Sequence, residues 1–433
     1  MRLKKLIVKN FKSLRNCEVE LGKFNVLVGP NASGKTNLIE VFKLLRKIYI
    51  EKDTNPFLEW WGYNNVVWGG KEELPITVGM LFDVDGHDVY FETTFTGTGG
   101  SFRILREVLE VKGYLKLIKT GSNLLTEYSP SFYRVITETP SVLLKEVHSG
   151  VMPKMELEAP KDKSLFQLLI PENPEESFLQ MVASIVFGIM PISGTKFKYN
   201  EKEGYIVSPS LNKHPLVSVF LREFLNFVNC LVLKGANLRE ARTPKFPRKE
   251  RALSEDASNL VPLLYNIWLR EGKLPDEISK PISIAFPNTR VFFQLTEDGR
   301  VMMKVFEGNL ELAPPSISDG FYKTLAILTA AYLKPPLLMI DEIENSLHPE
   351  TLELILDVLR GSESQVIITT HSPVVVDMTE PSDLILVDKV EGESRFVRIK
   401  DPEKIKRFLN EKGITLSEGW LYGSLLDLDI DEQ

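Results

Sequence analysis

The chain has 433 residues, which is long enough for two or three domains. It is 43% hydrophobic and 26% charged, as expected of an ordinary soluble globular protein with a large core. Its formal net charge of −7 argues against a surface that binds nucleic acid throughout, so any such site would be a local patch.

Cysteine usage and hydropathy point to a cytoplasmic protein without a membrane span. Cys17 and Cys230 are too few for a disulfide framework and lack metal-ligand spacing, which favours a reducing compartment. The N-terminal sequence MRLKKLIVKNFKSL is too charged for a signal peptide. The longest apolar stretch, residues 178–192, contains Gln180 and is too short to cross a bilayer, so a buried helix is expected there.

The first 110 residues predict strands around one helix. Residues 5–11 and 23–29 are strand-like, and residues 35–49 have the pattern of a helix. Residues 76–95 alternate on both sides of Asp85-Gly86, which predicts a β-hairpin.

The hydrophobic pattern changes between about residues 120 and 285, where leucine-rich amphipathic segments predict helices. Residues 214–233 and 257–272 are the clearest of these. Strands return over residues 289–308, with a turn at Asp298-Gly299.

The last part of the chain alternates strands and helices, which indicates a parallel sheet. The predicted elements are a helix from about 320, a strand over 336–341, a helix over 349–360, a strand over 365–370 and a hairpin over 383–400. We therefore predict an α/β fold with one core from both ends of the chain. Its predicted parts are residues 1–115 and 289–433, with residues 116–288 as a mostly helical insertion.

The octapeptide from Gly29 to Thr36, GPNASGKT, matches the pattern GxxxxGK[ST]. Its glycines allow backbone N–H groups to turn inward around an anion, and the following helix N-terminus favours negative charge. Lys35 would reach the β- and γ-phosphates of a nucleotide, and Thr36 would offer its hydroxyl to Mg²⁺. A purely structural glycine-rich turn is the alternative, but it gives no reason for a lysine between a strand and a helix.

Two later strands end in residues that suit phosphate chemistry. The strand over 336–341 ends in Asp341, which could hold Mg²⁺, and Glu342 follows it as a candidate to polarise water. The strand over 365–370 is followed by His371, which could hydrogen-bond a γ-phosphate or be an ordinary loop histidine.

A third candidate is the start of the helix near residue 320. Ser318, Asp319 and Gly320 precede an amphipathic run, and Ser or Asp there is good helix-capping chemistry. A capped helix start also exposes N–H groups that suit a γ-phosphate, so the two roles are compatible.

These motifs together resemble the ABC-type ATPase heads of the SMC, RecF and OLD (overcoming lysogenization defect) proteins. GPNASGKTN resembles their Walker A motif, ISDGF their signature motif, LLMIDEIENSLHP Walker B with the D-loop, and TTHSP the histidine switch. The chain resembles in particular the OLD-like ATPases that lack a coiled coil and a TOPRIM domain. The fold implied is a P-loop ABC-ATPase head with a mixed sheet.

The resemblance implies ATP and Mg²⁺ as cofactors and a head-to-tail homodimer that forms on ATP binding. Each ATP would lie between the Walker A motif of one chain and the signature helix of the other. Glu342 would be the general base, His371 the γ-phosphate sensor, and Asn345 and Ser346 would line the dimer interface. The implied nucleotide-binding residues are Asn31, Ala32, Ser33, Gly34, Lys35, Thr36, Asn37, Lys12, Ser13, Ser318, Asp319 and Gly320, and the implied metal ligands are Thr36 and Asp341.

Two departures from the family pattern stand out. No glutamine lies between Thr36 and Gln167, so the usual Q-loop ligand for Mg²⁺ is not identifiable; Asn64 or Asn65 are candidates for its place. About 60 residues follow His371, which leaves no room for a TOPRIM nuclease, so a nuclease or effector would be a separate partner.

The basic segment 234–251 is the best candidate for a DNA contact, although a solvated basic connector that offsets the acidic surface elsewhere is the favoured interpretation of its composition. The leading hypothesis is an ATP-driven clamp that acts on DNA or a nuclease partner in repair or anti-phage defence. A nucleotide-sensing dimerisation scaffold with negligible hydrolysis is the second. A transporter nucleotide-binding subunit is the third, and the stretch of about 280 residues between Lys35 and Ser318 argues against it.

Overall fold

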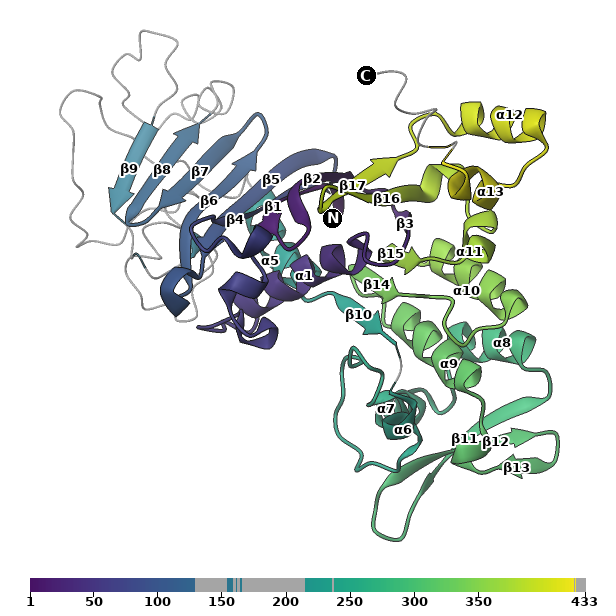
Figure 1. Ribbon diagram of the computed structural model, residues 1–433. Coiled ribbons are helices and arrows are strands. Elements are labelled where there is room, and N and C mark those ends of the chain that lie inside the picture. Colours follow the sequence, from purple (N-terminus) through teal and green to yellow (C-terminus); the bar gives the residue numbers. More distant parts are fainter. Residues whose placement is uncertain are drawn as a thin grey trace, which may run out of the picture. The chain divides into compact units, whose positions relative to one another are not determined.

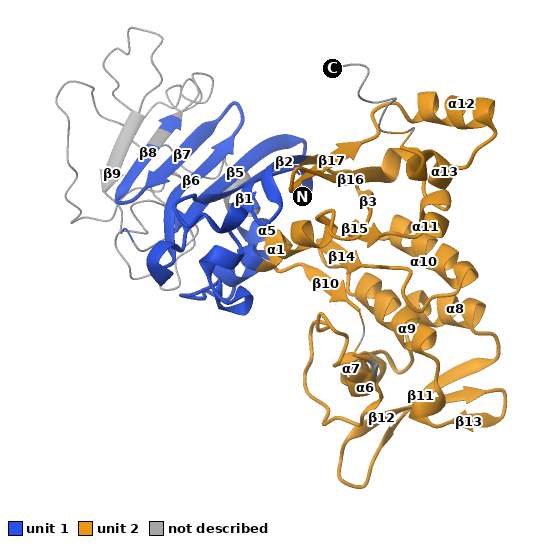
Figure 2. Cartoon of the chain, in the orientation of Figure 1, with its two compact units in different colours: residues 1–18, 44–226 blue, residues 19–43, 227–433 orange. Residues whose placement is uncertain are grey.

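The computed structural model divides into two compact units, shown in separate colours in Figure 2. Unit 1 comprises residues 1–18 and 44–226, and unit 2 comprises residues 19–43 and 227–433. The residues that the structure describes are 1–128, 154–158, 161, 164–165, 215–235, 237–423 and 425. The predicted buried helix over 178–192 lies outside them. None of the described helices is both long and apolar enough to cross a bilayer.

Unit 1 is built on an antiparallel sheet of eight strands in the order β2-β1-β4-β5-β6-β7-β8-β9 (Figure 1). The strands are β1 (Arg2–Phe11), β2 (Leu14–Glu20), β4 (Ile76–Val84), β5 (His87–Thr96), β6 (Arg103–Val111), β7 (Leu115–Thr120), β8 (Asn123–Tyr128) and β9 (Lys154–Glu158). From β4 onward, neighbours in the sheet are neighbours in sequence, so this sheet is a meander.

The predicted hairpin over residues 76–95 is confirmed. Strands β4 and β5 pair up to Val84 and His87, which leaves Asp85 and Gly86 as a two-residue turn. Both have positive φ, 52° and 85°, as a type I′ turn requires. The Asp-Gly pair is therefore sufficient to set the register of this hairpin.

An aromatic cluster fills the core of unit 1. Phe224 of helix α5 (Pro215–Val228) packs edge-on against Phe91, Phe82 and Tyr49, with ring centroids 4.8, 6.0 and 5.8 Å away. The predicted helix over 214–233 is thus confirmed up to Val228, but its last residues form a strand, β10 (Leu231–Lys234). A short apolar run suits either element, and pairing with a neighbouring strand in unit 2 decides the outcome.

Unit 2 contains the predicted parallel sheet, in the order β10-β14-β15-β3-β16-β17. All neighbours pair in parallel except the final hairpin β16–β17. Its remaining strands are β3 (Phe24–Val28), β14 (Leu337–Asp341), β15 (Gln365–Thr370), β16 (Leu384–Val390) and β17 (Glu393–Arg398). Strand β3 comes from the N-terminal part of the sequence and β14 to β17 from the C-terminal part, so both ends build one sheet.

Helices and a small second sheet complete unit 2. The helices are α1 (Lys35–Tyr49, which continues into unit 1), α6 (Leu238–Arg242), α7 (Leu260–Glu271), α8 (Asp276–Ala285), α9 (Asp319–Tyr332), α10 (Pro349–Gly361), α11 (Pro373–Asp377), α12 (Pro402–Lys412) and α13 (Leu416–Leu421). Strands β11 (Thr289–Leu295), β12 (Val301–Glu307) and β13 (Leu310–Leu312) form the small antiparallel sheet. Buried side chains of α7 to α13 and of the large sheet share one hydrophobic core.

The order of elements predicted after residue 289 is confirmed, including the turn at Asp298-Gly299. Much of the predicted insertion 116–288 lies outside the described residues, and its described part holds both helices and strands. The domain boundaries at residues 115 and 288 stay predictions.

Candidate functional site

The loop between β3 and α1 is shaped by its backbone. Ala32 and Gly34 have positive φ, 63° and 111°, so the chain turns in on itself before α1 starts at Lys35. Gly29 is required for another reason: a Cβ there would lie 2.0 Å from the carbonyl oxygen of Val387. The loop thus has the concave shape that binds anions in other proteins, and it opens at a helix N-terminus, whose first N–H groups have no intrahelical partner.

Lys35 lies folded into this loop. Its ammonium donates to the carbonyl oxygens of Gly29 and Pro30 at 2.7 and 2.9 Å. Burial lowers the pKa of Lys35, and the carboxylates of Asp341 and Glu342 oppose that shift. A phosphate would replace weak carbonyl acceptors with charged ones, so the lysine is already placed for such a ligand.

Asp341 lies at the carboxyl end of β14, and the parallel register through β15 to β3 brings that end beside the loop. The hydroxyl of Thr36 donates to both of its carboxylate oxygens, at 3.3 and 3.2 Å. The Thr369 hydroxyl donates to it as well, at 2.5 Å. A hydroxyl and a carboxylate that meet in this way are hard oxygen ligands, which fit Mg²⁺.

Few side chains in the part of the chain that the structure describes are available as metal ligands beside Thr36 and Asp341. Among the described residues, no group of three or more His, Cys, Asp or Glu side chains is arranged to hold a metal ion. Mg²⁺ at nucleotide sites is commonly held by one or two protein oxygens together with substrate phosphates and water. Thr36 and Asp341 therefore fit a metal that arrives with a nucleotide.

Glu342 is fixed at three points. Its N–H donates to the Thr369 hydroxyl at 2.9 Å, its carbonyl accepts from the Lys323 ammonium at 2.9 Å, and its carboxylate accepts from the Asn345 side-chain amide at 2.7 Å. The residue has a left-handed φ of 49°, which for a non-glycine residue is rarely adopted without such support. These contacts set the direction in which the carboxylate points.

Lys323 is a residue that the sequence analysis missed. It lies on α9 among buried apolar side chains, and this burial lowers its pKa to about 8, against the opposing effect of Glu344, Glu342 and Asp341. The signal in the sequence was a single lysine within the apolar run from Phe321 to Ala331. A buried ammonium requires an acceptor, which here is the Glu342 carbonyl.

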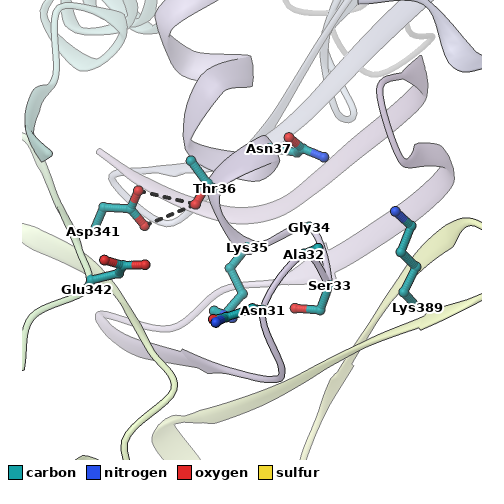
Figure 3. A pocket seen from close by; sticks show the side chains of 10 residues that line it. All are labelled: Asn31, Ala32, Ser33, Gly34, Lys35, Thr36, Asn37, Asp341, Glu342 and Lys389. Atoms are coloured by element: carbon teal, nitrogen blue, oxygen red, sulfur yellow. Dashed lines mark hydrogen bonds between the residues drawn. The ribbon is translucent and has the colours of Figure 1, made fainter.

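One pocket joins the loop to the two carboxylates (Figure 3). Its lining residues are Asn31, Ala32, Ser33, Gly34, Lys35, Thr36, Asn37, Asp341, Glu342 and Lys389. All of these were candidates from the sequence except Lys389. The structure therefore brings together two motifs about 300 residues apart in the sequence.

His371 does not line this pocket. Its backbone N–H donates to the Glu344 carboxylate at 2.9 Å, and the same oxygen lies 3.0 Å from its Nδ1. The side chain is 42% exposed, so it remains accessible to a ligand. Its role as a phosphate sensor stays a prediction.

The signature residues form the capped start of α9. The Ser318 hydroxyl accepts from the N–H of Phe321 at 3.2 Å, as the capping interpretation predicts. A Cβ on Gly320 would lie 2.7 Å from the carbonyl oxygen of Ser346, so this glycine packs directly on the D-loop. Ser318, Asp319 and Gly320 do not line the pocket of their own chain.

Comparison with known proteins assigns the site to a class. A family model described as "AAA ATPase domain" matches residues 1–79. A model described as "AAA domain, putative AbiEii toxin, Type IV TA system" matches residues 205–377. The first match contains the Walker A loop, and the second contains Asp341, Glu342 and His371. The chain carries an ATPase head of the SMC, RecF and OLD type.

Curated relatives match a short part of the chain. The DNA replication and repair protein RecF of Vibrio campbellii is 44% identical over 46 residues, which are 10% of this chain and 13% of RecF. RecF of Aliivibrio salmonicida is 41% identical over 46 residues, with the same coverage. The chain thus spans 13% of the length of the curated relatives that it matches.

Solved structures resemble the chain over most of its length. An SMC head bound to the C-terminal winged-helix domain of ScpA is 14% identical, with a TM-score of 0.48, and covers 94% of this chain and 100% of its own. The SMC head domain from Thermotoga maritima is 14% identical, with a TM-score of 0.41, and covers 93% and 100%. At these scores the likeness carries no argument, and the assignment follows from the family models together with the sheet order and the motifs described above.

Some predicted nucleotide contacts of the ATPase head belong to unit 1. Lys12 has a left-handed φ of 50°, and its N–H donates to the Val66 carbonyl at 2.7 Å. Ser13 is buried. Asn64 and Asn65, the candidates for the missing glutamine, lie in a short 3₁₀ turn (Tyr63–Asn65). A nucleotide contact for these four residues stays a prediction.

The basic segment 234–251 is less free than its composition suggests. Lys234 lies 3.5 Å from the Glu40 carboxylate, and Lys245 donates to the Ser258 carbonyl at 2.8 Å. Arg242 donates to the Ile317 carbonyl at 2.7 Å and to Asp319 at 2.6 Å, at the start of the signature helix of the ATPase head. The exposed basic side chains of this segment include Arg248, Lys249 and Arg251.

Proposed function

We propose that this chain binds ATP with Mg²⁺ at the pocket between the Walker A loop and β14 and hydrolyses it to ADP and phosphate. The observation that carries the proposal is the convergence of Lys35, Thr36, Asp341 and Glu342 on one pocket. When bound, Mg²⁺ would neutralise charge on the phosphate oxygens, with Thr36 and Asp341 as its protein ligands.

Glu342 is the proposed general base. Its carboxylate takes a proton from water, whose oxygen bonds to the γ-phosphorus while the bond to the β–γ bridging oxygen breaks. Lys35 exchanges the Gly29 and Pro30 carbonyls for phosphate oxygens and offsets the charge that leaves with ADP. The support of Glu342 by Lys323, Asn345 and Thr369 fits a base that must keep its direction.

We further propose that two chains meet head to tail, with each ATP between the Walker A loop of one and Ser318 of the other. The support is that Ser318 to Gly320 form an exposed helix start that does not line the pocket of its own chain. Such a start offers N–H groups to a γ-phosphate supplied by a second chain. ATP then closes the dimer, and its hydrolysis releases it.

The proposed cellular role is a switchable clamp on DNA or on a separate nuclease or effector, in repair or anti-phage defence. The RecF relatives are named for DNA replication and repair, which supports this proposal by analogy. One similar SMC head was solved in complex with a domain of ScpA, which is a property of that protein. For this chain, the exposed Arg248, Lys249 and Arg251 are the proposed contact with DNA phosphates.

The test uses Glu342→Gln and Lys35→Ala. Glu342→Gln should bind ATP normally and lose turnover by ~10²-fold or more, as expected when a general base is removed. Lys35→Ala should lose ATP affinity. The matched control for Glu342→Gln is Glu353→Gln, at an exposed position on α10. Native turnover in Glu342→Gln would remove Glu342 from this role, and negligible turnover in the native protein would favour the sensing scaffold.

Dimerisation is tested in the Glu342→Gln background by light scattering with ATP and Mg²⁺. Adding Ser318→Arg should abolish the ATP-dependent dimer and preserve ATP binding, because the cation would enter the partner's phosphate site. Ser283→Arg, on the exposed side of α8, is the control. Equal dimerisation of both arginine variants would contradict the sandwich.

A further inference from the structure

The hairpin β16–β17 is built against the Walker A loop at two points. Strand β16 runs parallel to β3, with Leu386 opposite Val28, so its next residues pass beside the loop. There the Val387 carbonyl contacts Gly29 so closely that no Cβ would fit between them. On β17, the buried Ser394 hydroxyl donates to the Ser33 carbonyl at 2.6 Å. The loop and the hairpin are therefore in direct contact at two points.

Lys389 is the cross-strand partner of Ser394. Residues directly opposite each other in an antiparallel pair project from the same face. Since Ser394 faces the loop, Lys389 faces it too, and it lines the pocket with Asn31 to Asn37. Its position follows from strand register and not from the chance direction of a surface side chain.

The ammonium of Lys389 has no hydrogen-bond or ion-pair partner within the part of the chain that the structure describes. The neighbouring Asp388 projects from the opposite face of the hairpin, and its carboxylate accepts from the backbone N–H of Lys389. A solvated turn lysine would also lack a partner, but nothing would fix it beside a phosphate loop. Here the Ser394 and Gly29 contacts do so.

Figure 3 shows the loop between Lys389 on one side and Asp341 and Glu342 on the other. In the proposed function, the two carboxylates mark the end of the pocket where the metal and the attacking water act. Lys389 then lies toward the end where the nonterminal phosphates leave the loop. We propose that Lys389 is a nucleotide-binding residue that contacts the α- or β-phosphate, and so recognises nucleoside diphosphates as well as triphosphates.

This inference rests on the proposed ATP site and adds a contact that persists after hydrolysis. A contact to nonterminal phosphates stabilises the ADP complex and the ATP complex alike, so it changes affinity without favouring either state. The loss of one charge-assisted, solvent-accessible contact should weaken both nucleotides by ~10-fold.

The experiment is calorimetric titration of the full chain with Mg²⁺–ADP, with ATP in the Glu342→Gln background, and with inorganic tripolyphosphate. The variants are Lys389→Ala, Lys389→Arg and the control Arg395→Ala, which removes a like charge from the other face of the same hairpin. We expect Lys389→Ala to bind all three ligands ~10-fold more weakly, Lys389→Arg to bind within about threefold of native, and Arg395→Ala to be unchanged.

Three results would overturn the inference while leaving the ATP site intact. Native affinity in Lys389→Ala would show that the lysine makes no contact. A loss for ATP alone would place it on the γ-phosphate, and a loss for both nucleotides but not for tripolyphosphate would place it on the sugar or base. Failure of the native protein to bind any of the ligands would instead refute the proposed function itself.

Discussion

Replacing Arg242 with alanine should loosen the start of the signature helix. The guanidinium bonds the Ile317 carbonyl and the Asp319 carboxylate, and it lies 5.2 Å from the ring centroid of Tyr322. All three partners are within the first turn of α9 or just before it. The side chain is only 22% exposed, so water replaces these contacts poorly.

The magnitude can be worked from the three contacts. A hydrogen bond from a charged donor to a carbonyl is worth about 1.5–3 kcal/mol. The ion pair adds at most about 1 kcal/mol because Asp319 is 54% exposed, and the cation–π contact adds about 0.5–1 kcal/mol. Arg242→Ala should therefore lower the free energy of local opening of this helix start by at least about 2 kcal/mol. That loss corresponds to roughly 30-fold faster amide exchange.

Hydrogen exchange followed by mass spectrometry on peptides over residues 317–325 is the assay. Arg248→Ala is the matched control, since Arg248 lies in the same segment but is exposed. ATP binding should survive in both variants because Arg242 does not line the pocket. If exchange over residues 317–325 is unchanged in Arg242→Ala, or changes equally in the control, Arg242 does not position this helix.

Three further predictions address the loop, the base and the basic segment. Gly29→Ala should lower the thermal midpoint and nucleotide affinity because its Cβ would overlap Val387. Gly361→Ala, with open space around it in α10, should lower neither and should raise the thermal midpoint slightly. Lys323→Met should lower kcat by ~10-fold at unchanged ATP affinity, because the Glu342 carbonyl loses the hydrogen bond from the Lys323 ammonium. An equal loss of kcat and of ATP affinity would instead indicate misfolding. Changing residues 248, 249 and 251 together to Glu should abolish salt-sensitive binding of a labelled duplex in fluorescence anisotropy and spare ATP hydrolysis, and duplex binding at native strength would exclude the segment.

The sequence was sufficient wherever the chemistry is local. The Walker A loop is continuous from Gly29 to Thr36, and its strand and helix flank it directly, so one stretch carries the whole pattern. The Asp85-Gly86 hairpin is local in the same sense. Ser318 was predicted as a cap because capping depends only on the next three residues.

The sequence did not predict contacts between residues that are far apart in the chain, because these contacts depend on how distant strands and loops pair. Lys389 reaches the pocket because β16 pairs with β3, and its neighbourhood in sequence, DKVEGE, shows only a turn. Residues 231–234 join the sheet through β14, although their own pattern continues that of a helix. From the sequence, Arg242 is one of several basic residues in segment 234–251. The structure shows that it donates to the carbonyl of Ile317, 75 residues away.

The contact between Gly320 and the Ser346 carbonyl has a consequence for cooperativity. In a head-to-tail dimer, Gly320 serves one ATP, while Ser346 belongs to the segment that carries Glu342 and Asn345 and serves the other. Because no methyl group fits between them, a displacement at one catalytic site of the proposed dimer would move the signature helix that contacts the other ATP. The two hydrolysis events should therefore not be independent, and turnover should rise with ATP concentration with a Hill coefficient above one.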